Sequence, residues 1–167
     1  MPCAESLHAR GRPAFTSARL QSRDAKALDR YFPELLESLA RGLPGGCVLD
    51  GEIVVVGLQG LDFDALQQRI HPAASRIERL ARETPASFVA FDLIALDGKD
   101  LSSLPQQERR LLLQALLFDA ALPIHLSPMT TSHALALEWL RSFEGASLDG
   151  VVAKAADGPY RQASARC

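Results

Sequence analysis

The stretch that decides the fold is Val48-Leu49-Asp50-Gly51-Glu52-Ile53-Val54-Val55-Val56, in which apolar residues surround two carboxylates. This density of β-branched residues predicts a strand, and alternate side chains of a strand face opposite sides. One face would carry only apolar residues or glycine: Leu49, Gly51, Ile53 and Val55. The opposite face would carry Asp50 and Glu52, which are costly to bury without partners. Two interpretations stay open, a solvated sheet end or a pocket for a cation or sugar hydroxyls.

A second strong strand is predicted over residues 88–96, and the turn Asp97-Gly98 ends it. Regular alternation would place Phe88, Ala90 and Asp92 on one face and Val89, Phe91 and Leu93 on the other. Phe91 has two interpretations: a core phenylalanine, or a platform for a flat heterocycle.

The other segments interleave helices and short strands without regular alternation. The expected helices cover the leucine-rich segment 28–42, then 61–70, 73–83, 105–118 and 132–143, the last with Ser132 as N-cap. The expected strands are a weak edge strand over 15–22, a short strand over 124–127 and a last strand over 150–155. This mixed order favours an α+β fold with largely antiparallel sheets.

The length and charge set limits on the class of protein. A chain of 167 residues with 47% hydrophobic and 23% charged residues suits one soluble domain. The net charge of −2 excludes a global basic field, so any contact with nucleic acid has to be local. No apolar run is long enough to span a membrane, and residues 1–16 do not resemble a secretory signal, so we expect a cytoplasmic protein.

The segment Leu148-Asp149-Gly150-Val151-Val152-Ala153-Lys154 combines a carboxylate, a glycine and a lysine. A lysine that closes an apolar strand is usually a surface residue. Asp149 and Lys154 would face opposite sides of a flat strand, so they share one site only if the chain bends, which Gly150 permits.

Four short motifs follow one another in the order Ser22-Arg23, Asp50-Gly51-Glu52, Phe91-Asp92 and Asp149-to-Lys154. Their combination resembles the adenylation (nucleotidyltransferase) domain of ATP-dependent DNA ligases, especially the bacterial repair type. The resemblance runs from about residue 20 to residue 160. It implies an α+β fold with antiparallel sheets around a nucleotide cleft, with residues 1–167 as one incomplete adenylation domain.

The resemblance also implies roles for single residues. Arg23 would contact the nucleotide, Glu52 would bind the ribose and help to place a metal ion, and Phe91 would stack on adenine. Asp149 would lie near the metal and Lys154 near the phosphates, while Arg166 matches an arginine that precedes the family's final lysine motif. The implied cofactors are ATP and Mg²⁺, and the implied partner is nicked double-stranded DNA.

The sequence departs from the family pattern at the nucleophile. In the family, a lysine in a Lys-x-Asp-Gly motif attacks the α-phosphate of ATP, a P–N bond to AMP forms and pyrophosphate leaves. No such motif occurs in the 167 residues, whose three lysines are Lys26, Lys99 and Lys154. The family also has a Lys-x-Lys motif after its last strand and then an oligonucleotide-binding domain, and we expect this chain to lack both. We therefore expect no catalytic lysine and no DNA joining by this chain alone. The alternative is a non-catalytic remnant that binds a nucleotide or a partner.

Overall fold

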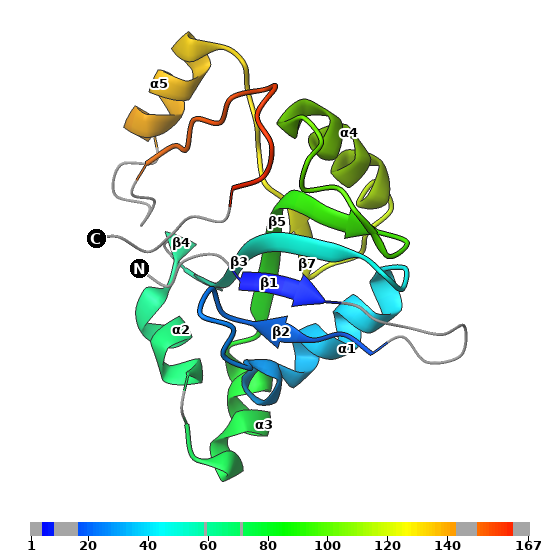
Figure 1. Ribbon diagram of the computed structural model, residues 1–167. Coiled ribbons are helices and arrows are strands. Elements are labelled where there is room, and N and C mark those ends of the chain that lie inside the picture. The colour runs from blue at the N-terminus through cyan, green and yellow to red at the C-terminus, as the bar shows by residue number, and fades with distance from the viewer. Residues whose placement is uncertain (1–4, 9–16, 59, 71, 143–149, 162–167) are drawn as a thin grey trace.

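Two long antiparallel strands, β3 (Val48–Gly57) and β5 (Ala86–Leu96), form the centre of the computed structural model (Figure 1). The structure describes residues 5–8, 17–58, 60–70, 72–142 and 150–161. In the sheet the strands follow the order β2-β1-β3-β5-β6, with β4 paired to β3 and β7 paired to β5. Every pairing is antiparallel except the parallel pair of β5 and β7. The predicted α+β class with largely antiparallel sheets is confirmed.

The remaining strands are short: β1 (Glu5–His8), β2 (Leu20–Gln21), β4 (Gly60–Leu61), β6 (Lys99–Asp100) and β7 (Ile124–Leu126). The helices are η1 (Asp29–Tyr31), α1 (Pro33–Gly42), α2 (Phe63–Arg69), α3 (Ala74–Glu83), α4 (Gln106–Leu116) and α5 (His133–Ser142). No helix in the described ranges is long and apolar enough to cross a membrane.

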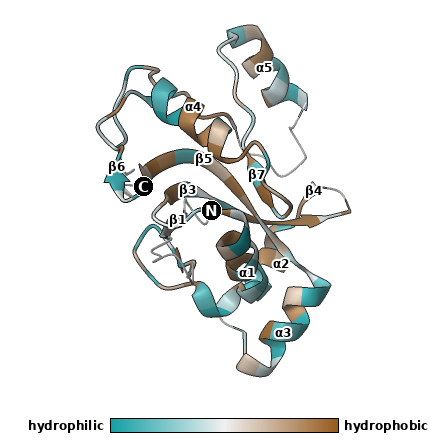
Figure 2. Cartoon of the chain, turned by 90° about the vertical axis from the view of Figure 1, so that its right-hand side faces the viewer, coloured by the Kyte–Doolittle hydropathy of each residue, from teal (hydrophilic) through white to brown (hydrophobic). Residues whose placement is uncertain are grey.

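The hydrophobic core lies between the sheet and its helices. Leu35 and Leu39 of α1 pack in one cluster with Leu49 and Ile53 of β3. Helix α4 adds Leu113 to the same cluster. Both views show α4 and α1 on opposite sides of the β3–β5 pair (Figures 1 and 2). The helix spacing of the leucines therefore marked core positions correctly, because a helix buries residues that recur every three or four positions.

A buried ion pair joins α2 to α1. The Arg69 guanidinium is fully buried, and its Nη1 lies 2.7 Å from Glu34 Oε1. Arg69 also donates to the backbone carbonyl oxygens of Tyr31 and Thr84, each at 2.7 Å. Glu34 in turn accepts a hydrogen bond from the backbone N–H of Ala86, where β5 begins. These bonds fix α2 and the start of β5 against α1, since a buried charge requires partners.

A β-bulge interrupts β5 at the middle of its pairing with β3. Gly51 pairs with Ala90, and the preceding Asp50 pairs with Asp92, so Phe91 is an extra residue on β5. A bulge reverses the alternation of faces beyond it. The regular alternation expected for this strand is therefore wrong: Asp92 shares a face with Asp50, whereas Leu93 lies in the core.

Gly51 is required by the close approach of β5 to β3. A Cβ atom on Gly51 would lie 2.6 Å from the carbonyl oxygen of Val89 and would overlap the ring of Phe88. The glycine of the Asp50-Gly51-Glu52 motif thus has a packing role, because only a residue without a side chain fits between the ring and the strand.

Several predictions about elements are confirmed, and two need correction. Helix α1 ends at Gly42 as expected, and Ser132 Oγ accepts a hydrogen bond from the N–H of Leu135 at the start of α5. The strand predicted over 150–155 is wrong: these residues are described but form no strand. They follow an irregular path, and the residues just after them, Ala156 and Gly158, accept backbone hydrogen bonds from the start of α4. Strand β1 was not predicted, and its polar sequence Glu5-Ser6-Leu7-His8 carries no strand signal.

Replacing Gly51 with alanine is expected to lower the free energy of unfolding by about 1–3 kcal/mol, the usual cost of overpacking a core. Urea denaturation followed by circular dichroism measures the change. Gly150→Ala is the matched control, since a Cβ atom there meets nothing within 4 Å. Equal stability of Gly51→Ala and the control would contradict the packing role.

Candidate functional site

Two carboxylates lie side by side on the face of the sheet that is opposite α1 and turned toward α4 (Figures 1 and 2). Asp50 of β3 and Asp92 of β5 are paired residues in the register, and both are buried. Glu52 lies two residues beyond Asp50 on the same strand, so it shares this face. Neighbouring carboxylates repel each other unless cations or proton donors compensate them. The compensating groups come from α4 and from residues 150–161.

Arg109 of α4 compensates Asp92 through both of its carboxylate oxygens. Its Nε lies 2.8 Å from Oδ1 and its Nη2 lies 3.0 Å from Oδ2. The side chains of both residues are almost completely inaccessible, with exposed fractions of 1% for Arg109 and 2% for Asp92. This forked geometry is the strongest ordinary ion-pair arrangement, and lysine cannot reproduce it.

Lys154 is the second cation at Asp92, and it also covers the ring of Phe91. Its Nζ lies 3.4 Å from Asp92 Oδ2 and 4.8 Å from the centroid of the Phe91 ring. The β-bulge makes this possible, because it presents Phe91 and Asp92 to one ammonium group. A cation over an aromatic face is attracted by the ring quadrupole. Lys154 and Phe91, both named from the sequence, therefore lie in contact. Lys154 comes 62 positions after Asp92, the residue that follows Phe91 in the chain.

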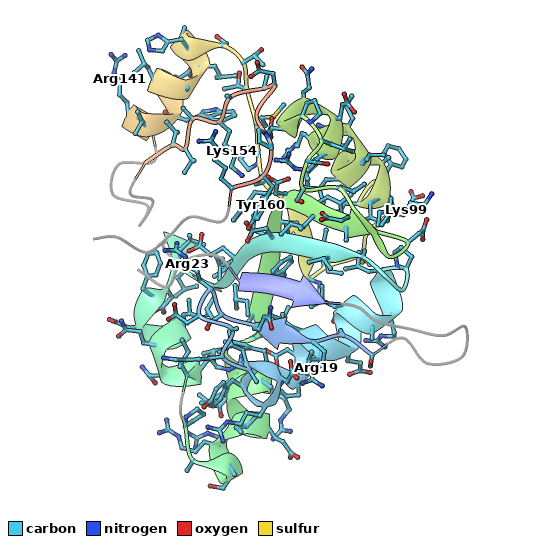
Figure 3. All side chains as sticks on the ribbon, viewed as in Figure 1. Arg19, Arg23, Lys99, Arg141, Lys154 and Tyr160 are labelled. Atoms are coloured by element: carbon cyan, nitrogen blue, oxygen red, sulfur yellow. The ribbon has the colours of Figure 1, made fainter. Side chains whose placement is uncertain are left out.

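Tyr160 compensates the other carboxylate. Its hydroxyl donates a hydrogen bond to Asp50 Oδ2 at 2.9 Å, and its ring lies 5.9 Å from the Arg109 guanidinium. Figure 3 shows Lys154 and Tyr160 on the irregular segment above β3. Both side chains thus reach the paired carboxylates from a segment that is remote from β3 and β5 in the sequence.

The start of α4 holds this irregular segment in place. The N–H groups of Gln106 and Gln107 donate to the carbonyl oxygens of Gly158 and Ala156, each at 2.9 Å. The N–H of Tyr160 donates to the carbonyl oxygen of Ser102 at 2.8 Å. The first N–H groups of a helix have no partner within the helix, so residues 156–158 satisfy two of them. This docking holds residues 156–160 at the start of α4 and at the loop before it.

The two aspartates have opposite pKa shifts. Burial raises the pKa of Asp50, and the Tyr160 hydrogen bond and the Lys154 charge offset this only in part. Burial also acts to raise the pKa of Asp92, but the bonds from Arg109 and the charge of Lys154 outweigh it and the pKa falls below its usual value. Burial and the Asp50 charge raise the pKa of Tyr160, so its hydroxyl stays protonated and donates.

The other residues named from the sequence are less closely connected to this cluster. Arg23 is half-buried in the turn after β2, and no hydrogen bond or ion pair links it to Phe91 or Lys154 within the described part of the chain. Figure 3 draws it toward the β4 end of β3, away from Lys154. Asp149 and Arg166 lie outside the described residues. The structure therefore brings Phe91 and Lys154 together and leaves the other roles as predictions.

Sequence reasoning missed Arg109 and Tyr160. Arg109 carried a signal, because Leu113 and Leu116 lie four and seven positions after it on one face of α4. A charged residue on the apolar face of a helix usually has a buried partner. Tyr160 had no comparable signal, since its contact with Asp50 spans 110 positions of the sequence.

Comparison with known proteins gives the family. The sequence model described as the ATP dependent DNA ligase domain matches residues 14–166, which is most of the chain. This chain belongs to the ATP-dependent DNA ligase family. The match includes the four motifs and agrees with the resemblance expected from them.

Curated relatives and solved structures agree with the family assignment. The chain is 50% identical over 142 residues to DNA ligase C2 of Mycolicibacterium smegmatis, covering 85% of this chain and 40% of the relative. It is 52% identical over 139 residues to DNA ligase C of Mycobacterium tuberculosis, covering 81% of this chain and 39% of the relative. A mycobacterial DNA ligase D complexed with ATP and MES matches with a TM-score of 0.66 and 29% identity, covering 96% of this chain and 48% of that one. The ligase-family chain thus spans about 40% of the length of these curated relatives.

The two aspartates of this ligase-family chain are expected to respond differently to neutralisation. Asp92→Asn is expected to lower the free energy of unfolding at neutral pH by about 3–5 kcal/mol, because it leaves the buried Arg109 charge without its carboxylate. Asp50→Asn is expected to be neutral or stabilising, because it removes a buried charge and keeps an acceptor for Tyr160. Urea denaturation of both variants measures the difference, and equal losses would contradict it.

The same pair predicts the pH dependence of stability. Asp92 binds its proton less tightly in the folded state. Its contribution to the free energy of unfolding is therefore complete above the ordinary carboxyl pKa and is lost as the pH falls through the lowered pKa of the folded state. Asp50 binds its proton more tightly in the folded state, so stability rises as the pH falls through its raised value. Urea titrations between neutral and acidic pH should show a weaker acid loss in Asp92→Asn and a stronger one in Asp50→Asn. The reverse order would refute the assigned shifts.

Proposed function

We propose that this chain is the nucleotide-binding part of a DNA ligase adenylation domain and binds ATP on the sheet face that carries Glu52, Phe91 and Lys154. The observation that carries the proposal is the position of the Lys154 ammonium over the Phe91 ring and beside Asp92. An aromatic ring for a base and a cation for phosphate oxygens are what an adenine nucleotide needs within one site. The ATP complex of a ligase relative supports the choice of ligand.

In this proposal each residue binds one part of the nucleotide. Phe91 stacks on the adenine, and Lys154 keeps Asp92 as a partner while another of its three N–H donors binds a phosphate oxygen. Glu52 accepts hydrogen bonds from the ribose hydroxyls, as carboxylates commonly do. Arg23 and Arg166 contribute further positive charge to the nucleotide, and Asp149 contributes a carboxylate near the metal.

Magnesium would enter the site together with the triphosphate. Among the described residues no group of three His, Cys, Asp or Glu side chains is close enough to hold a metal ion. Mg²⁺ usually needs only one or two carboxylates in addition to phosphate oxygens and water, and the family resemblance implies Glu52 and Asp149 for this role. When bound, the ion would neutralise phosphate charge and orient the leaving pyrophosphate.

None of the three lysines, all of which lie in the described ranges, is placed as a nucleophile for adenylation. Lys154 is committed to Asp92 and Phe91, while Lys26 and Lys99 are exposed on turns and short edges of the sheet. An attacking amine has to be neutral, which desolvation favours, whereas Lys26 and Lys99 are exposed to solvent. The sealing of nicked DNA in repair is therefore proposed for the whole ligase. For this chain alone, the proposal is nucleotide binding without covalent chemistry. A remnant that binds only a partner protein is the alternative, and ATP binding separates the two.

ATP binding tests the proposed site. Wild-type protein is expected to bind ATP with Mg²⁺ in isothermal titration calorimetry, and Phe91→Ala is expected to weaken binding. A stacked base contributes about 1–3 kcal/mol, which is about 5- to 150-fold in Kd. Phe118→Ala is the matched control, since Phe118 is 85% exposed and lies after α4. Absence of binding by the wild type would favour the partner-binding alternative.

Mass spectrometry of the intact protein tests the missing nucleophile. After incubation with ATP and Mg²⁺, the mass of this chain is expected to stay unchanged, because no lysine is placed to attack the α-phosphate. A DNA ligase that contains the Lys-x-Asp-Gly motif serves as positive control. A covalent gain of one AMP by this chain would refute the expectation, and peptide mapping would then identify the lysine.

A further inference from the structure

Arg109 connects the elements that carry the candidate site. Besides its two bonds to Asp92 of β5, its Nη1 donates to the carbonyl oxygen of Leu104 before α4 and, at 3.4 Å, to that of Gly158. Its guanidinium also faces the ring of Tyr160. One buried side chain thus holds the sheet, the loop before α4 and the segment that carries Lys154.

Asp92 connects Arg109 to Lys154, so that Arg109 also restricts the position of the Lys154 ammonium. Arg109 bonds both oxygens of Asp92, which fixes the plane of the carboxylate, and Oδ2 then faces the Lys154 ammonium. Within the described ranges, Asp92 is the only carboxylate that forms an ion pair with Lys154. A long lysine side chain has many rotamers in solution, so its place above Phe91 depends on this partner.

We propose that Arg109 is a positioning residue, which sets the place of the Lys154 ammonium above Phe91 by fixing Asp92 and by docking residues 156–160. The proposal rests on the proposed function only in what Lys154 would bind, a nucleotide phosphate. Arg109 itself is buried and does not contact the nucleotide. The other buried arginine pair, Arg69 with Glu34, bonds α1, α2 and the backbone of Tyr31, Thr84 and Ala86, so it does not reach the segment that carries Lys154.

The ring of Phe91 provides a direct measure of the position of Lys154. Protons above an aromatic ring resonate upfield, and the chain contains only three lysines. In wild-type protein labelled with ¹³C-lysine, one Hε–Cε signal is expected upfield of the other two, and Phe91→Leu and Lys154→Met assign it. Lys26 and Lys99 are exposed and serve as internal references. A wild-type spectrum with three coincident lysine signals would overturn the proposal.

Arg109→Gln tests the positioning role, and Arg110→Gln is the matched control. Arg110 is the next residue of α4 and is also buried, but it donates to the side chain and backbone of Ser127 instead. In Arg109→Gln the upfield shift of Lys154 is expected to fall by more than half, whereas Arg110→Gln keeps it. An unchanged or larger shift in folded Arg109→Gln would mean that Asp92 attracts Lys154 without help, which refutes the proposal.

A second variant covers the case in which Arg109→Gln does not fold. Arg109→Met combined with Asp92→Leu removes both buried charges together and leaves neither unpaired. Loss of the upfield signal in this double variant supports the chain of contacts from Arg109 to Lys154. Retention of the signal overturns it, because Lys154 would then stay above Phe91 without either partner.

ATP titration separates this proposal from the proposed function. If ATP binds, Arg109→Gln and Lys154→Met are each expected to raise the Kd by similar factors. A protein that carries both Arg109→Gln and Lys154→Met is expected to raise the Kd by less than the product of the two single factors, because both substitutions act on one contact. A full product would indicate independent roles and contradict the proposal. If wild-type protein does not bind ATP, the proposed function fails, while the spectra still decide whether Arg109 positions Lys154.

Discussion

A carboxylate buried within a β-sheet requires compensation, and the arrangement of this molecule around Asp92 follows from that requirement. Removing charges from water costs several kcal/mol per ion, and Asp92 faces Asp50 across two paired strands. Arg109 and Lys154 supply the positive charge, and Tyr160 supplies a proton donor to Asp50. Each of these groups brings its own segment to the sheet, so the buried charge organises the tertiary contacts of α4 and residues 150–161.

The β-bulge at Phe91 is the local feature that brings the residues of the candidate site together. It presents an aromatic ring and a carboxylate, adjacent in sequence, to one ammonium group. Gly51 allows the two strands to approach closely enough for the bulge to form against Phe88. The glycine and the Phe91-Asp92 pair are therefore parts of one packing arrangement, although their motifs lie forty residues apart in the sequence.

Much of the fold could be read from the sequence because local patterns decide it. The β-branched run at 48–56, the turn Asp97-Gly98 with φ angles of 51° and 74°, and the leucines of α1 each specify an element with few alternatives. The order of the motifs identified the family. The strand over 150–155 was mispredicted because apolar, β-branched residues indicate a strand, whereas pairing depends on a neighbour that local sequence does not supply.

The sequence by itself determined the fold class and the family, and it named Phe91 and Lys154 as candidate nucleotide-binding residues. Only the tertiary structure decided which residues hold them together. Arg109 and Tyr160 act on Asp92 and Asp50 across 17 and 110 positions of the chain, and no local pattern specifies such contacts. The physical reason is that helix and strand formation depend on neighbours in sequence, whereas charge compensation depends on neighbours in space.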